Sequence, residues 1–117
     1  MNQTAEKPST SIPMDISIET LYKQWLTLGN ESIIIDIRSE NDYQSGHIPG
    51  SKNIPFASVI ERSAELTPFK HIYFYCYGGQ GSTNVAKMLS DRGFDNIYYV
   101  GQAGLSDWQD NGYPLQS

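Results

Sequence analysis

The sequence predicts an α/β fold, a single domain with a central, mostly parallel five-stranded sheet and helices on both faces. Short apolar or β-branched runs alternate with segments whose apolar residues recur every three or four positions. Strands joined through helices pair in parallel, because a right-handed crossover returns the chain to the same end of the sheet. The length of 117 residues and the hydrophobic fraction of 38% fit one folded domain.

The first half of the chain begins with a short entry strand at residues 14–17. Ser17 is predicted to cap a helix whose apolar residues recur at three- and four-residue steps until Gly29. The β-branched run 32–37 is predicted to be a strand buried on both faces. A short helical turn is expected from Ser39 to Gly46, followed by a turn at 47–50 and a brief strand at 51–54.

The second half repeats this alternation. A helix is predicted at 55–66, and the apolar run 72–75 is predicted to be the next strand. A helix from Ser82 to about Gly93 follows, then a strand at 97–100 and a final helix at 103–110. Ligands of such sheets bind beyond the carboxyl ends of the strands, so we expect the site at this edge.

Composition excludes several function classes. The net charge of −5 argues against a nucleic-acid surface, and no apolar run has the length of a membrane span. Residues 1–13 lack the apolar stretch of a secretory signal and are predicted to be a flexible leader, with the domain at 14–117. One cysteine without metal-ligand spacing predicts neither a disulfide nor a metal site. We therefore expect a cytoplasmic protein, by default a monomer.

The most informative feature is the only cysteine, Cys76, which directly follows the predicted strand 72–75. A glycine-rich loop leads from it to the helix that Ser82 is predicted to cap; the loop residues are Tyr77, Gly78, Gly79, Gln80 and Gly81. Loop amides and the helix dipole favour an anion there, and so the reactive thiolate. A lone cysteine is often only buried core, but these glycines leave room for the backbone to wrap an anion.

Several segments resemble the rhodanese-like sulfurtransferase family, in the right order and from about residue 16 to residue 115. They are Asp36-Ile37-Arg38, Gly46-His47-Ile48-Pro49-Gly50-Ser51, Tyr75-Cys76 through Ser82, and Gly93-Phe94 through Pro114. The resemblance implies that Cys76 takes a sulfane sulfur from a donor and holds it as a persulfide. An acceptor such as cyanide, a thiol or a partner protein then removes it. No metal or organic cofactor is implied.

Roles are also expected for three residues outside the loop, for Asp36 and His47 from the resemblance and for Arg38 from its acidic neighbours. Asp36 is expected to accept hydrogen bonds near the loop, and Arg38 to pair with Asp36 or Glu40 rather than with substrate. His47 is interpreted as a hydrogen-bonded structural histidine of its turn, not as a general base. Within the loop, Gln80 is expected to contact substrate, and Tyr77 to form an apolar lip.

The loop departs from the family pattern in charge. Many single-domain members carry an arginine directly after the cysteine and another before the Ser/Thr of the helix, where this chain has Tyr77 and Gly81. Ala103 likewise replaces the first glycine of a late pair. We therefore expect weak transfer from thiosulfate, a dianion, and a preference for a persulfide or another less charged donor.

Two other functions stay open at this stage. A cysteine-dependent phosphatase or arsenate reductase would also place a thiolate before a helix, but phosphoryl transfer favours an arginine fork that the loop lacks. A sulfur carrier without turnover, or a protein-recognition module, is the second alternative. The retained cysteine and glycines argue against a fully inactive module.

Overall fold

The computed structural model describes residues 12–117, so most of the predicted leader lies outside the described residues. The strands are β1 (Met14–Asp15), β2 (Ser32–Asp36), β3 (Lys52–Asn53), β4 (His71–Tyr75) and β5 (Ile97–Tyr99). The α-helices are α2 (Ile18–Leu26), α3 (Glu40–Ser45), α4 (Gln80–Asp91) and α5 (Leu105–Asp110). Two 3₁₀ turns, η2 (Phe56–Ser58) and η3 (Ser63–Leu66), lie between β3 and β4.

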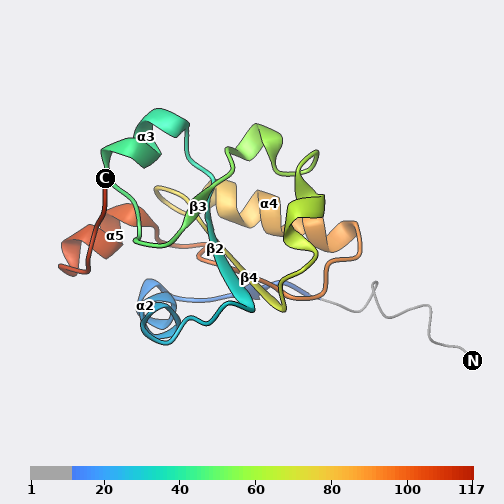
Figure 1. The fold of residues 1–117 in the computed structure, drawn as a ribbon, viewed down its shortest axis with the longest axis horizontal. Helices are drawn as coiled ribbons and strands as arrows, with labels where there is room; N and C mark the ends of the chain where they lie inside the picture. Colours follow the sequence, from blue (N-terminus) through green and yellow to red (C-terminus); the bar gives the residue numbers. More distant parts are fainter. Residues whose placement is uncertain (1–11) are drawn as a thin grey trace, which may run out of the picture.

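The described part of the chain forms one five-stranded sheet in the order β1-β5-β4-β2-β3, and every neighbouring pair is parallel (Figure 1). This confirms the predicted α/β fold. β2 and β4 form the centre and pair over their whole length, so that Asp36 lies beside Tyr75 at the carboxyl ends. Among residues 12–117 no helix is long and apolar enough to cross a membrane.

Two hydrophobic clusters cover the two faces of the sheet, because successive strand residues point to opposite sides. One cluster joins Ile35 and Phe74 to α4, η3 and the residues around η2. The other joins Ile34 and Tyr75 to α2 and α5. Figure 1 shows α4 and α2 on opposite sides of the strands. The apolar strands read from the sequence are therefore buried on both faces.

Most predicted boundaries agree with the structure. Ser17 caps α2 as predicted, because its Oγ accepts a hydrogen bond from the amide of Thr20 at 3.0 Å. Ser39 caps α3 in the same way, and Gly46 ends it. Gly93 follows α4 with a positive φ of 98°, the conformation that glycine adopts at little cost.

The helix predicted at 55–66 is wrong. The segment forms the two 3₁₀ turns η2 and η3 joined by further turns, and its apolar residues Val59 and Leu66 are buried. Serine and β-branched residues in its interior (Ser58, Val59, Ile60, Ser63) have low helix propensity, and short tight turns suffice to bury the apolar side chains.

Candidate active site

Cys76 lies one residue beyond the end of β4 and is 9% exposed. Its side chain belongs to the cluster beneath α4, yet its Sγ accepts a hydrogen bond from the amide of Gly79 at 3.0 Å. A backbone amide directed at this atom is a hydrogen-bond donor for a charged sulfur. The sulfur is therefore held by the loop that follows it, as the sequence predicts.

The conformation of this loop depends on Gly79. Its φ of 110° is one that residues with a side chain rarely adopt. A Cβ at this position would also overlap the backbone carbonyl of Gly101, in the segment after β5. Glycine is thus required here both by the turn and by the close approach of a second segment.

Helix α4 begins two residues earlier than predicted. Gly79 is its N-cap, and the first intrahelical bond runs from the amide of Thr83 to the carbonyl of Gly79 at 3.1 Å. The amides of Gln80, Gly81 and Ser82 have no hydrogen-bond partner among residues 12–117. Free amides and the dipole of a 12-residue helix make this helix terminus suitable for an anion next to the sulfur.

The predicted capping role of Ser82 is wrong, because Ser82 lies inside the first turn of α4 rather than before it. Its side chain is fully buried, and its Oγ has no hydrogen-bond partner in the described chain. A buried hydroxyl without a partner is uncommon and costs stability. Ser82 therefore carries a buried hydroxyl that residues 12–117 leave without a hydrogen bond.

The segment before α5 closes the other side of the loop. The amide of Leu105 donates to the carbonyl of Cys76 at 2.9 Å, and Gly104 packs directly against the loop backbone. A Cβ on Gly104 would overlap the carbonyls of Cys76 and Tyr77. Neither Gly101 nor Gly104 was predicted as a site residue, because only the assembled sheet brings them to the loop.

Asp36 and Arg38 form a buried ion pair at the carboxyl end of β2, so that of the two acids expected as partners of Arg38 it is Asp36 that pairs with it. Nη2 of Arg38 lies 2.8 Å from Oδ2 of Asp36, and their side chains are 9% and 0% exposed. Arg38 also donates to the carbonyl of Gly46 at 2.6 Å. Burial acts to lower the pKa of Arg38, but the hydrogen bond and charge of Asp36 outweigh it, so the net shift is upward. This guanidinium is held by the protein, as expected for a structural role.

His47 lies in the turn that follows α3. Its Nδ1 donates to the carbonyl of Tyr43 at 2.7 Å, and the two rings stack with centroids 3.7 Å apart. Its backbone forms a two-bond bridge with Gln116. These contacts give His47 a structural environment and none of them joins it to Cys76.

Comparison with known proteins identifies the family. The sequence model of the Rhodanese-like domain matches residues 20–111, a range that includes Cys76, the loop and the Asp36–Arg38 pair. The chain belongs to the rhodanese-like domain family. The resemblance of the sequence motifs is thereby confirmed.

Two curated relatives and one solved structure illustrate the similarity. YrkF of Bacillus subtilis, named as a sulfur carrier protein, is 34% identical over 100 residues, which are 86% of this chain but only 52% of YrkF. The thiosulfate sulfurtransferase GlpE of Pseudoalteromonas translucida is 35% identical over 83 residues, 70% of this chain and 78% of GlpE. A rhodanese-related protein of Thermoplasma volcanium superposes with a TM-score of 0.74 at 25% identity, covering 88% of this chain and 97% of its own.

The surroundings of the sulfur in this rhodanese-like domain are apolar on one side. A Cβ placed on Gly81 would lie 3.8 Å from Sγ of Cys76, 3.8 Å from Cδ1 of Phe56 and 3.2 Å from Cδ1 of Ile37. Phe56 and Tyr77 are 41% and 62% exposed. Phe56 was not predicted as a neighbour of the site, because only the folded chain brings it close to Gly81.

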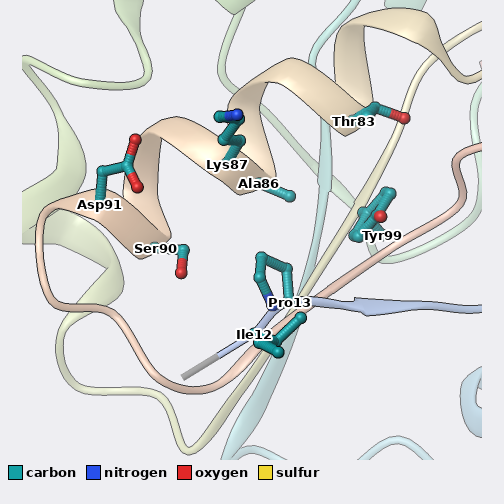
Figure 2. Close-up of a pocket in the computed structure, with 8 residues that line it drawn as sticks. All are labelled: Ile12, Pro13, Thr83, Ala86, Lys87, Ser90, Asp91 and Tyr99. Atoms are coloured by element: carbon teal, nitrogen blue, oxygen red, sulfur yellow. The ribbon is translucent and has the colours of Figure 1, made fainter. Parts of the chain in front are cut away.

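Two hollows of the rhodanese-like domain lie close to the loop or to α4. One, of about 190 Å³, is bordered by Tyr77 of the loop and by residues of α3 and α5. A larger one, of about 280 Å³, lies between α4 and the entry to β1, where Ile12, Lys87 and Tyr99 line it (Figure 2). Cys76 is part of neither described lining, and the lining of the larger hollow also lacks the loop residues 77–81. Size alone therefore does not mark the reactive site.

Proposed function

We propose that this rhodanese-like domain is a sulfurtransferase that moves a sulfane sulfur through a persulfide on Cys76. The observation that supports it most directly is the hydrogen bond from the amide of Gly79 to Sγ of Cys76, at the N-terminus of α4. A sulfur held at the end of a parallel strand, beside free helix amides, suits a nucleophile that is negatively charged before and after it reacts.

The transfer has two steps and needs no external oxidant or reductant. The thiolate of Cys76 attacks the outer sulfur of a donor, the donor's bond to that sulfur breaks, and its electron pair leaves with the donor fragment. Cys76 then carries a terminal sulfur as a persulfide anion. An acceptor nucleophile attacks that terminal sulfur, the S–S bond breaks, and the thiolate of Cys76 is restored.

The amides of Gln80 and Gly81 are proposed to bind the charge of the terminal sulfur. The persulfide places its charge one bond beyond Sγ, and these amides are the donors that the helix leaves unpaired. The buried hydroxyl of Ser82 is proposed as a further donor, which would satisfy a group that has no partner in residues 12–117. Gln80, which is exposed, is proposed to contact the rest of the substrate.

The lack of charge in the same loop indicates which sulfur donors should react poorly. Residues 77–81 carry no charge, and the guanidinium of Arg38 is held by Asp36 and by the carbonyl of Gly46. Thiosulfate brings two negative charges, and these contacts leave it no cation of the loop to pair with. We therefore propose a persulfide as the better donor, and transfer to a thiol, to cyanide or to a partner protein.

The function is tested by intact-mass spectrometry of the reduced protein after separate exposure to thiosulfate and to a small-molecule persulfide. We expect a gain of one sulfur, about 32 Da, with the persulfide and little with thiosulfate. Cys76→Ser is the matched control and should gain none. No gain by the wild-type protein with either donor would refute the proposal.

A carrier without efficient turnover is the second candidate, because the name of YrkF refers to sulfur carriage and the loop lacks cations. Repeated transfer from persulfide to cyanide or to a thiol separates the two. An enzyme gives many turnovers per Cys76, whereas a carrier loads one sulfur and releases it slowly unless its protein partner is added.

A further inference from the structure

We propose that the hollow beside Tyr77 is a subsite for an ammonium group of the sulfur donor or acceptor, so that the preferred small substrates are aminothiols or their persulfides. This inference rests on the proposed function for its role in transfer, but the binding itself is a separate property. The hollow measures about 190 Å³ and lies between α3, the loop and α5.

The hollow lies beside the loop that follows Cys76. Tyr77, which borders the hollow, is the residue directly after Cys76, and Leu105, which also borders it, donates its amide to the carbonyl of Cys76 at 2.9 Å. The hollow is therefore adjacent to the reactive segment on its Tyr77 side. The described lining of the hollow includes Tyr77 but not Cys76, so the substrate of this proposal must extend from the sulfur past Tyr77 to reach the hollow.

The charged side chains at and behind the border of the hollow carry a net negative charge. Two ionic side chains border the hollow, Arg38 and Asp42. Arg38 is neutralised by Asp36, with a bidentate contact in which Nε and Nη2 both donate. The side chain of Asp42 makes no hydrogen bond or salt bridge within the range 12–117, although its charge acts on that of Arg38. The three charges sum to −1, so the hollow attracts a cation.

The border of the hollow also supplies hydrogen-bond acceptors. An ammonium group has three donors and no acceptor, so its site must supply acceptors. Asp42 provides a carboxylate, and Gln109 provides an amide oxygen at the same border. The hydroxyl of Ser45 donates its proton to the carbonyl of Asn41 at 3.0 Å, which leaves its oxygen as an acceptor. The aromatic ring of Tyr77 can add a cation–π contact.

The binding test is an NMR titration of the reduced wild-type protein with 2-(methylthio)ethylamine, a thioether that cannot transfer sulfur. The matched neutral probe is 2-(methylthio)ethanol. We expect saturable shifts of the amides of Ser45, Tyr77 and Gln109 with the amine, and affinity at least about threefold weaker for the alcohol, the size expected for a partly exposed ion pair. Equal shifts with both probes would refute the subsite.

The variant Asp42→Asn should weaken amine binding by about threefold to fivefold and leave the alcohol unaffected. Glu40→Gln is the matched control, because Glu40 has the same charge, lies on the same helix and is exposed, but does not border the hollow. Equal weakening in both variants would show a general field effect instead of a subsite.

The role in transfer is tested with thiol acceptors of two to four carbons that end in an amine or in a hydroxyl. The ratio of kcat/KM between wild type and Asp42→Asn, taken for each acceptor, cancels the intrinsic reactivity of the thiol. We expect about threefold to fivefold for the amines and a ratio near one for the alcohols. A ratio near one throughout would overturn the substrate role. If Cys76 loads no sulfur at all, the proposed function fails, while the titration still decides whether the hollow binds ammonium.

Discussion

Replacing Gly81 by arginine should convert thiosulfate into a better donor. Gly81 lies in the first turn of α4 with ordinary helical geometry, so a side chain is allowed there. Its Cβ would be 3.8 Å from Sγ of Cys76 and 3.2 Å from Cδ1 of Ile37, a tight contact that the end of the Ile37 side chain relieves by moving slightly. Helix propensity favours arginine over glycine by up to about 1 kcal/mol, so the variant should fold.

The expected gain follows from Coulomb's law. A guanidinium about 5 Å from a dianion in water contributes about 1.7 kcal/mol, and physiological salt reduces this to about 1 kcal/mol. The corresponding rise in kcat/KM for thiosulfate is about fivefold to twentyfold. The gain should shrink as ionic strength increases, because the site is open to solvent.

The assay is thiocyanate formation from thiosulfate and cyanide at several salt concentrations. Gly81→Gln is the matched control, since it adds a side chain of similar reach and helix propensity but no charge. A neutral donor should respond equally in both variants. The charge argument fails if Gly81→Gln raises thiosulfate turnover as much as Gly81→Arg, or if neither raises it.

Three further substitutions test the surroundings of the site. Gly104→Ala should lower the unfolding free energy by several kcal/mol and abolish sulfur loading, because the added methyl overlaps the carbonyl of Cys76. Urea denaturation measures the stability, and intact-mass spectrometry measures the loading. Arg38→Met leaves the buried carboxylate of Asp36 unpaired and should cost about 3 kcal/mol in the same denaturation assay, whereas an unchanged midpoint would contradict the pairing. Burial, and after it the charge of Asp36, raise the pKa of the Tyr75 phenol in the folded protein. Above about pH 10 the unfolded chain therefore loses a phenol proton that the folded protein keeps. Wild-type stability should then fall by about 1.4 kcal/mol per pH unit more steeply than that of Tyr75→Phe, and equal slopes would refute the shift.

The central part of the fold could be predicted because local patterns and tertiary burial agree there. Residues 33–35 of β2 and 72–75 of β4 are β-branched or aromatic, and all of them except Ile33 are buried. Ser17 caps α2 because its hydroxyl meets an amide three residues on, a purely local interaction. Cys76 could be placed at the sheet edge from the end of the apolar run alone.

The errors occur where contacts distant in sequence decide the backbone. Serine is a preferred N-cap, yet Gly79 occupies that position in α4, because the loop must turn its amide back to Sγ of Cys76. The close approach of Gly101 to Gly79 joins segments that are separated by a strand and a helix. No local pattern around Gly101 predicts that contact, and the same holds for Phe56 beside Gly81.

If both proposals hold, the loop and the hollow together favour a substrate with a negative charge at its sulfur end and a positive charge at the other. Free amides at the N-terminus of α4 can bind the single negative charge of a terminal sulfur, which needs no cation. A second negative charge on the donor would meet the uncharged loop and the carboxylate of Asp42. A positive charge a few bonds from the sulfur would instead be stabilised by that carboxylate. Thus the absence of loop arginines does not imply lost reactivity. On the proposed function we expect selection against dianions and, through Asp42, selection for substrates that carry an ammonium group.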